Sequence, residues 1–514
     1  MPSFEKLQQP RYRWIGFAFI SISLLATSIN NMVLNVAMPV IARELNASTS
    51  DLQWIQDAYI LVFAALLLAM GALSDRYGRK RFLLVGVSSF ALFAILAALA
   101  RTTTLVIFAR ALQGIGAAII MPSTLSLISA LFPEPRERAK AIAIWSAMFG
   151  AGVSIGPILG GLLLEMPGFM WNGIFLVNVP FALIAFVGVY IYVPESYGGS
   201  RGKLDIPGVV LSTAGLFALV YAIIKGGELG WSSPDFLLGM AVALLLISGF
   251  IWWERHSPEA MLPLHFFKNP SFSVASITMM FALFGLFGFS FFLPLFFQGI
   301  QNYSALETGL LMFPQAVLSV TVSWNSHHII NWIGVKKTTS WGMVLVAVGA
   351  IMLASILRTD TSYWIILASL IITFIGIDIA LPAATVSIMG SVPDSKAGIG
   401  SGMNEMTGNT GGALGIAILG AILNRVYLKK ILPLESLVPQ GMLEDINSSI
   451  FSAHKAIESL GGDTVSELLQ VVDNAFVSGL RIVMLVCFML FTLLALFTAR
   501  FLPSEIIKLS DKDQ

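Results

Sequence analysis

The chain has 514 residues, of which 56% are hydrophobic and only 11% carry a charge, and its net charge is +1. A soluble domain carries about 25% charged residues, so this composition excludes a water-soluble protein and indicates one that folds in a lipid bilayer. The near-neutral charge gives no sign of a nucleic-acid partner. The single cysteine, Cys487, excludes a disulfide within the chain and is most simply a core residue.

Apolar runs of about 20 residues, the length that crosses a bilayer as a helix, recur along the whole chain. The first begins near Trp14, is too long for the core of a signal peptide and has no small-residue cleavage site, so we interpret it as the first span. The sequence therefore predicts an all-α membrane protein with fourteen transmembrane helices. The predicted spans are 14–36, 52–74, 82–100, 104–130, 139–165, 172–193, 206–225, 235–253, 273–297, 306–331, 339–357, 363–387, 398–425 and 480–502.

Lysines and arginines fix the predicted orientation, because they are more frequent in cytoplasmic segments. With the N-terminus inside, 20 of the 30 lie in cytoplasmic segments, nine lie outside, and Arg110 lies within a span. This predicts a multi-pass protein of the cell membrane with both termini in the cytoplasm. The 20 are Lys6, Arg11, Arg13, Arg76, Arg79, Lys80, Arg81, Arg136, Arg138, Lys140, Arg201, Lys203, Arg255, Lys268, Lys336, Lys337, Lys396, Arg500, Lys508 and Lys512.

One long segment, 426–479, separates the last two spans and is predicted on the outer side. Its part 464–478 has apolar residues at helical spacing from Val465 to Val472. We expect a short hairpin that packs against the outer face.

A charged turn of unusual density lies between the second and third spans. It reads Gly-Ala-Leu-Ser-Asp-Arg-Tyr-Gly-Arg-Lys-Arg and includes Gly71, Asp75, Arg76, Gly78 and Arg79. A carboxylate here can accept hydrogen bonds from a helix N-terminus and pair with a basic side chain, which makes a breakable latch. The alternative is a set of charges that only fixes topology, but the glycine spacing favours the latch.

A weaker copy of this turn follows the tenth span, as two repeated six-span halves would require. Gly334, Lys336 and Lys337 are retained there, whereas Asn331 replaces the acid. The predicted domains are an N-terminal six-helix bundle (1–193), two inserted helices (194–272) and a C-terminal six-helix bundle (273–514).

Arg110 places a guanidinium group within the predicted fourth span. An arginine at the centre of a membrane helix costs about 2.5–3.5 kcal/mol on insertion scales and usually marks a transport pathway. A structural arginine bonded to carbonyl groups is the alternative.

Small residues line one face of the predicted fifth span. Gly152, Gly156 and Gly160 recur every four residues, and Pro157 lies beside them. Such a stripe allows close helix packing and the proline bends the helix, so we predict a packing and gating role rather than contact with a ligand.

Three acidic residues lie deep in predicted spans, namely Asp57, Asp378 and Glu405. A low-dielectric interior favours the protonated form of a carboxyl group, which suits a proton carrier. Trp54 and Tyr59 lie close to Asp57 in the sequence, and an acid beside aromatic rings also suits a lipophilic cation. An acid bonded to a neighbouring helix is the alternative for each.

The sequence contains no phosphate-binding loop, nucleotide fingerprint or nucleophile elbow, and no metal-ligand spacing surrounds His327 and His328. We therefore expect neither an enzyme nor a cofactor, with a proton gradient as the driving force.

The whole chain resembles the fourteen-span drug:proton antiporters of the major facilitator superfamily. The resemblance rests on the turn at Gly71, on Arg110 with its following glycines, on the Gly-x-x-x-Gly-Pro-x-x-Gly-Gly pattern from Gly152, and on Trp-Ile-Gln-Asp-x-Tyr from Trp54. It implies the major facilitator fold, with two six-helix bundles and two extra central helices, and export of a lipophilic substrate against proton entry.

The chain departs from that family in its acids. Many members have an acid in the first span where this chain has Asn30, and cation exporters can have acids where it has Ser319 and Asn409. Asp57 and Glu405 would then be the main proton carriers. The predicted proton-coupling residues are Asp57, Glu405, Arg110 and Asp378, and the predicted substrate-binding residues are Asp57, Tyr59, Trp54, Asn30 and Glu405.

These features predict a monomeric, proton-coupled exporter of small lipophilic, cationic drugs or antiseptics that works by alternating access. The missing acids leave open a neutral or anionic natural product, a peptide or a lipid as the cargo. A non-transporting sensor or scaffold is the next alternative, and an integral-membrane enzyme ranks last.

Overall fold

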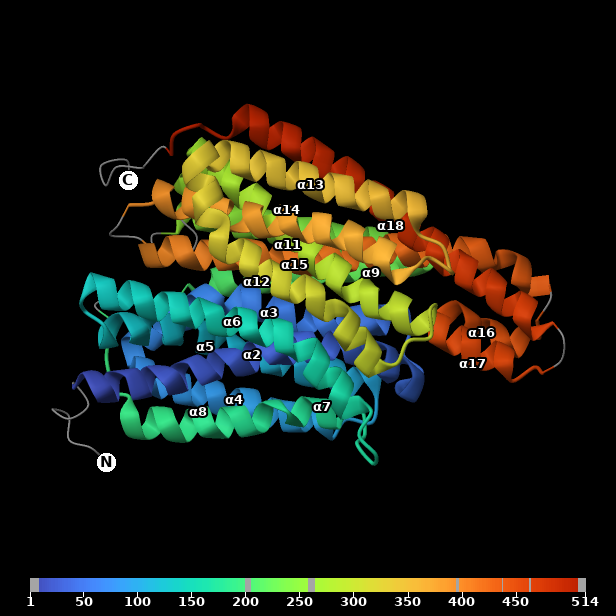
Figure 1. Cartoon of the computed structure of the whole chain (residues 1–514), viewed down its shortest axis with the longest axis horizontal. Helices are drawn as coiled ribbons and strands as arrows, with labels where there is room; N and C mark the ends of the chain where they lie inside the picture. The colour runs from blue at the N-terminus through green and yellow to red at the C-terminus, as the bar shows by residue number, and fades with distance from the viewer. Residues whose placement is uncertain are drawn as a thin grey trace.

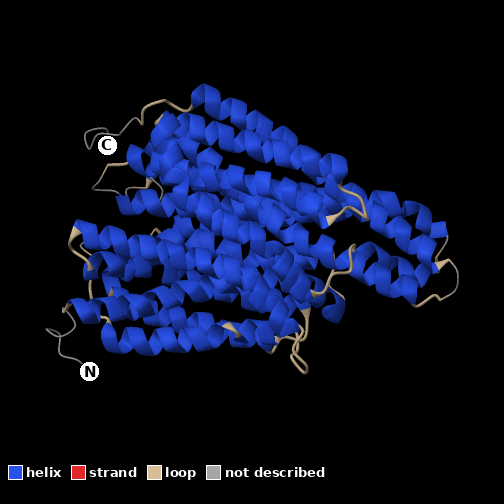
Figure 2. Ribbon diagram, in the orientation of Figure 1, coloured by secondary structure: helices blue, strands red, loops and turns tan. Residues whose placement is uncertain are grey.

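The structure is a computed structural model that describes residues 9–198, 205–257, 264–393, 397–436, 438–461 and 464–506. Over these residues the chain is helical, without a β-strand (Figure 2). Fourteen of the helices are long and apolar enough to cross a membrane, which confirms the predicted count and the all-α class. Six basic residues used for the predicted orientation lie outside the described residues: Lys6, Arg201, Lys203, Lys396, Lys508 and Lys512.

The first seven helices form one half of the molecule, drawn in blue to green in Figure 1. In this half α2 packs on α6 and α8, and α5 packs on α3 and α4. The helices are α2 (Pro10–Leu45), α3 (Thr49–Tyr77), α4 (Arg79–Ala98), α5 (Thr103–Leu131), α6 (Pro135–Leu164), α7 (Gly173–Leu176) and α8 (Asn178–Tyr192).

The remaining helices comprise a tightly packed pair, α9 (Ile206–Leu229) and α10 (Pro234–His256), and a second half in which α11 packs on α14 and α15. The two halves meet where α6 contacts α12, α3 contacts α15, and α2 contacts α11. The second half consists of α11 (Pro270–Gly299), α12 (Ala305–Ile333), α13 (Val335–Ile356), α14 (Tyr363–Ser391), α15 (Ala397–Ile431), α16 (Gln440–Ser448), α17 (Ile450–Glu458) and α18 (Val465–Phe501), with short 3₁₀ helices at Leu264–Lys268 and Leu432–Ser436.

The two halves share a glycine turn and a serine capping box at corresponding positions, although the residues of the charged turns are only partly the same. Gly78 alone separates α3 from α4, and Gly334 alone separates α12 from α13, with φ angles of 111° and 83°. These positive φ angles favour glycine, so the glycine retained in the weaker copy has a backbone reason. Ser48 and Ser304 each begin the first helix of the pair with a capping box.

The start of α2 and the end of α18 lie at the same end of the bundle, which we call the N/C face (Figure 1). The helices α16 and α17 project from the other end, which we call the opposite face. The turn at Gly78 belongs to the N/C face, because α2 and α3 cross the bundle in opposite directions.

Two predicted boundaries are wrong. The first span does not end at 36, because α2 continues to Leu45 and stops where Asn46 adopts a left-handed conformation. The stretch 464–478 is helical as predicted, but it is the first part of α18 and not a separate element. No proline interrupts the chain between Val465 and Leu480, so the amphipathic stretch and the apolar span form one helix.

Candidate functional site

A buried polar network surrounds Arg110 on α5. Its Nε donates a hydrogen bond to the Ile55 carbonyl oxygen at 3.2 Å, and its Nη1 donates to Gln113 Oε1 at 2.8 Å. The guanidinium carbon lies 4.2 Å from the centre of the Tyr59 ring. The side chain has no exposed surface, so these contacts replace water around Nε and Nη1, whereas Nη2 is buried with no hydrogen-bond partner among the described residues.

The network continues from Gln113 into two further helices. Gln113 Nε2 donates to Asn30 Oδ1 at 3.2 Å, and Asn178 Nδ2 donates to the same oxygen at 2.9 Å. Polar side chains of α2, α5 and α8 and a backbone carbonyl of α3 are thereby joined within the first half. Asn30, predicted to contact the substrate, is a buried member of this network.

Replacing Arg110 by lysine should slow transport by about tenfold or more, since a hydrogen bond from a charged group contributes about 1.5–3 kcal/mol. Lysine keeps the charge but lacks the planar fork that reaches the Ile55 carbonyl and Gln113 together. The measurement is the initial uptake rate in proteoliposomes. Arg101→Lys, at an exposed position before α5, is the control and should leave the rate unchanged.

Asp57 lies on a different side of α3. Gln53, one turn earlier, donates from Nε2 to the carbonyl oxygens of Ile416 and Ala417 on α15, at 2.9 and 3.1 Å. Trp54 stacks on Phe217 of α9 with ring centres 6.1 Å apart. At about 100° per residue, Asp57 points between these two directions. Its carboxylate has no exposed surface and no hydrogen-bond partner among the described residues.

Of the two aromatic residues predicted beside Asp57, only Trp54 lies on a neighbouring side of the helix, about 60° away. Tyr59 is about 160° from Asp57 around the helix and faces Arg110, whereas Trp54 faces α9. Arg110 and Asp57 are therefore separated by the α3 backbone. Any coupling between these two groups has to pass through α3, which Arg110 holds at the Ile55 carbonyl.

The other two acids lie in the second half. Asp378 on α14 is 7% exposed and lies beside Ser319 and Ser323 of α12. Glu405 on α15 is half-buried. It lies between the helix side that approaches α3 at Gly402 and the side that approaches α11 at Gly408. Glu405 thus faces the interior between the two halves.

The predicted latch residues lie together at the N/C face. Asp75 Oδ1 accepts a hydrogen bond from Arg79 Nε at 2.7 Å, and Arg79 Nη1 donates to the Ser126 carbonyl oxygen at 3.3 Å. A Cβ at Gly71 would lie 3.4 Å from Pro122 of α5, and Arg76 is exposed beside Tyr77.

A residue that the sequence analysis did not select, Glu195, completes this turn. Its carboxylate accepts hydrogen bonds from the backbone N–H groups of Lys80 at 2.9 Å and Arg81 at 3.2 Å, at the start of α4. A Cβ at Gly78 would lie 2.9 Å from this carboxylate. The chain that leaves α8 therefore caps α4, and a side chain at Gly78 would displace the capping carboxylate as well as strain the positive φ.

Removing the Glu195 carboxylate should loosen this turn. Glu195→Ala is expected to destabilise the start of α4 by about 1 kcal/mol, the typical value of a lost N-terminal cap. Hydrogen exchange at residues 79–82 should accelerate in Glu195→Ala and change less in Glu195→Gln, which keeps an acceptor. Equal protection in Glu195→Ala and the unaltered protein would contradict the capping role.

The glycine stripe of α6 packs against α2. A Cβ at Gly152 or Gly156 would lie within 2.6 Å of Ser28 or Met32, and one at Gly160 would lie 3.1 Å from the Val33 carbonyl oxygen. Pro157 and Gly161 instead contact the second half. A Cβ at Gly309 of α12 would lie 2.4 Å from the Pro157 oxygen, and one at Gly161 would lie 2.5 Å from the Ala305 oxygen.

Near the opposite face, side chains of one half bond to the backbone of the other. Such contacts fix the relative position of the halves, because a backbone group cannot move without its helix. The bonds are Gln53 to Ile416 O at 2.9 Å, Gln298 to Val36 O at 2.9 Å, and the Leu306 N–H to Glu165 Oε1 at 3.0 Å.

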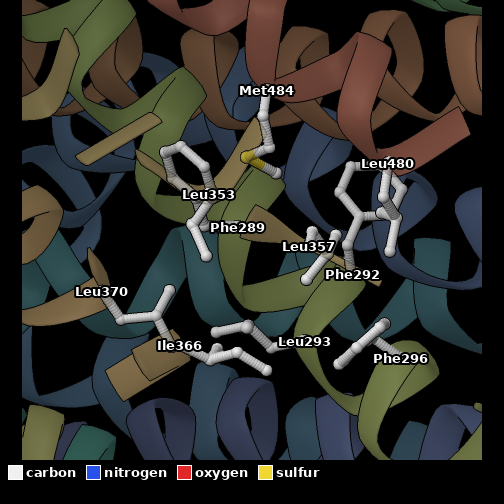
Figure 3. Close-up of a pocket in the computed structure, with 10 residues that line it drawn as sticks. All are labelled: Phe289, Phe292, Leu293, Phe296, Leu353, Leu357, Ile366, Leu370, Leu480 and Met484. Carbon is white, nitrogen blue, oxygen red and sulfur yellow. The ribbon is translucent and has the colours of Figure 1, made fainter. Parts of the chain in front are cut away.

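A small cavity lies within the second half, between α11, α13, α14 and α18 (Figure 3). Its volume is about 30 Å³, and its ten lining side chains, among them Phe289, Leu353 and Met484, are all apolar. Sites for drug-sized ligands measure about 300–1,000 Å³. This cavity is therefore too small for such a cargo, and none of the predicted site residues lines it.

Comparison with known proteins decides the family. Residues 20–416 match the sequence model of the Major Facilitator Superfamily. The chain belongs to this superfamily. The predicted resemblance is confirmed, and the protein is a multi-pass membrane transporter.

Its similar relatives include named drug-resistance proteins. The chain is 34% identical over 473 residues to the multidrug efflux pump LfrA of Mycolicibacterium smegmatis. The aligned residues cover 92% of each protein. It is 31% identical over 470 residues to the methyl viologen resistance protein SmvA of Salmonella typhimurium, covering 90% of this chain and 93% of SmvA.

Solved structures show the same fold. A bacterial homologue of the human lysosomal transporter Spinster has a TM-score of 0.69 at 17% identity, covering 98% of this chain and all of that one. A D-xylose–proton symporter has a TM-score of 0.62 at 14% identity, covering 96% and 98%. Both support the major facilitator fold of this transporter.

Three polar residues of this transporter were missed by sequence reasoning. Gln113 and Asn178 join the Arg110 network, and Gln56 is 1% exposed with neither amide atom hydrogen-bonded to the described residues. All three are uncharged polar side chains within apolar spans. That signal, which usually marks an interhelical bond or a pathway, could have identified them.

Proposed function

We propose that this transporter exports lipophilic cationic drugs or antiseptics across the cell membrane in exchange for protons. The observation that carries the proposal is the fully buried carboxylate of Asp57, which has no hydrogen-bond partner among the described residues. An ionised carboxylate in such a place is costly without a counter-charge. A proton and a cationic cargo can each supply that charge, and competition between them produces exchange.

The relatives support the chemical class of the cargo. LfrA is named as a multidrug efflux pump and SmvA as a methyl viologen resistance protein. Methyl viologen is an aromatic dication, which an acid close to aromatic rings can bind. Asp57 and Glu405 would carry the protons, and Asp378, which lies between α14 and α12, would be a third acid.

Transport would proceed by alternating access between the two six-helix halves, 1–193 and 273–514, around the inserted pair in 194–272. The side-chain-to-backbone bonds near the opposite face support a state that is closed on that face. Both termini would lie in the cytoplasm, and the bond between Asp75 and Arg79, which is formed in the state described here, would be part of the cytoplasmic latch. A single chain contains both halves, so we infer that the monomer is the functional unit.

Arg110 would couple the first half to Asp57 through α3. Its hydrogen bond to the Ile55 carbonyl holds the backbone two residues before Asp57, and Gln113 connects it to α2 and α8 through Asn30. A change at Asp57 that shifts α3 would therefore be transmitted to three other helices.

The test is reconstitution of the unaltered protein in liposomes that contain a pH-sensitive dye. Addition of ethidium or a quaternary ammonium compound should move protons at a rate that saturates with the cation. If no cation moves protons, the proposed function is wrong, and the same vesicles can be tested with neutral and anionic natural products. Protein-free liposomes are the control.

A further inference from the structure

The inserted helix α9 lies across the contact between α3 and α15, one of the three places where the halves meet, which we call a seam. It contacts both α3 and α15. A Cβ at Gly227 of α9 would lie 2.5 Å from Ala421 Cα on α15, and Phe217 of α9 stacks on Trp54 of α3 with an interplanar angle of 11°. The close approach and the stack fasten α9 to both halves.

A second seam, between α6 and α12, has a different character. Large apolar side chains are exposed on both helices there: Ile155 and Leu162 are each 49% exposed, and Leu310 and Phe313 are 51% and 40% exposed. The inserted pair therefore makes these two seams unequal, and the seam that α9 covers is the one that contains Asp57.

Asp57 points into the space shared by α3, α9 and α15. The side chain before it in that direction, Gln53, reaches α15, and Trp54 reaches α9. The carboxylate lies between them, fully buried and without a hydrogen bond to the described residues. An acid next to a stacked pair of aromatic rings has the chemistry that recognises a lipophilic cation, through charge and through ring contact.

We propose that α9 forms one wall of the Asp57 site and that Phe217 is a specificity-determining residue for the aromatic part of the cargo. The assignment of specificity rests on the proposed function, whereas the wall itself does not. The wall shields Asp57 from the bilayer, and the stacked rings of Phe217 and Trp54 offer aromatic contact to a cation that approaches the carboxylate.

The wall can be tested without transport. Dicyclohexylcarbodiimide dissolves in the bilayer and modifies protonated carboxyl groups, and mass spectrometry locates the modified residue. Labelling of Asp57 should be severalfold faster in Phe217→Ala than in the unaltered protein. Phe236→Ala is the matched control, because the Phe236 ring packs on Trp231 within the inserted pair, at 5.4 Å. Equal labelling rates in all three proteins would contradict the proposal that α9 forms a wall of the Asp57 site.

Specificity is tested by comparing an aromatic with an aliphatic cation. In Phe217→Ala the KM for ethidium should rise about two- to tenfold, the value of one aromatic pair, and Phe217→Tyr should restore it. The KM for dodecyltrimethylammonium, which has no ring, should change less. Equal changes for both cations would overturn the role in specificity. If the unaltered protein transports neither cation, the proposed function fails, and the labelling result still decides whether α9 is a wall.

Discussion

Replacing Asp57 by asparagine should abolish cation-driven proton movement while the protein still folds. Asparagine has the same shape but cannot take up and release a proton at neutral pH. No hydrogen bond from the described residues to the Asp57 carboxylate would be lost, and the cost of burying an ionisable group would be removed. We therefore expect the apparent melting temperature to stay the same or rise. The rate of proton movement should fall to the level of protein-free liposomes.

Asp51 provides a control on the same helix. Its carboxylate accepts hydrogen bonds from the Ser48 N–H at 3.0 Å and the Ser48 hydroxyl at 2.8 Å, in the capping box that begins α3. Asp51→Asn keeps an acceptor, so it should lower stability by less than about 1 kcal/mol, the value of a lost cap, and it should leave proton movement intact, because a cap carries no proton. The two variants should thus have opposite effects on stability and on coupling. Proton movement that survives in Asp57→Asn and disappears in Glu405→Gln would assign the carrier to Glu405 instead.

The number of spans could be predicted from the sequence because bilayer thickness fixes the length of an apolar run. The residues at which helices begin and end could be predicted less well. The extension of α18 back to Val465 lies outside the apolar run, and only the absence of a breaker indicates that the helix continues. Conversely, the local caps at Ser48 and Ser304 are short signals that could have marked the repeat at the start of α3 and α12.

The side of a helix on which a residue lies is also accessible from the sequence. Asp57 and Tyr59 are two residues apart on a helix, so their side chains must face different neighbours. In the structure, α15 and α9 lie on the Asp57 side and Arg110 lies on the Tyr59 side. Which helices those neighbours belong to could not be predicted from the sequence. The packing of α9 over α3 and the capping of α4 by Glu195 join segments more than 100 residues apart. No periodicity or local motif encodes such pairs, because they arise from tertiary packing.

A bulky residue at Gly161 should slow transport by forcing the halves apart at the opposite face. In the structure a Cβ at this position would lie 2.5 Å from the Ala305 oxygen and 2.6 Å from Leu306 Cα. Both are backbone atoms of α12, so the clash can be relieved only if α6 and α12 separate. Overpacking of this kind costs about 1–3 kcal/mol, which would shift the balance between conformations by about 5- to 150-fold. Gly161→Ile should therefore depopulate the state described here and slow transport to a similar extent.

The shift can be measured by the distance between spin labels at Leu162→Cys and Leu310→Cys, positions that are exposed on α6 and α12. The one native cysteine, Cys487, is fully buried and should not compete for the label. Gly150→Ile is the matched control on the same helix, because a Cβ there would meet only Val320 Cγ2, at 3.5 Å. Gly309→Ala approaches the same seam from α12, where a Cβ would lie 2.4 Å from the Pro157 oxygen, and should lengthen the distance as well. If Gly161→Ile retains both the original distance and the original transport rate, the contact between α6 and α12 does not separate during the cycle. The moving seam would then be the one between α3 and α15, where α9 would have to move with one of the halves.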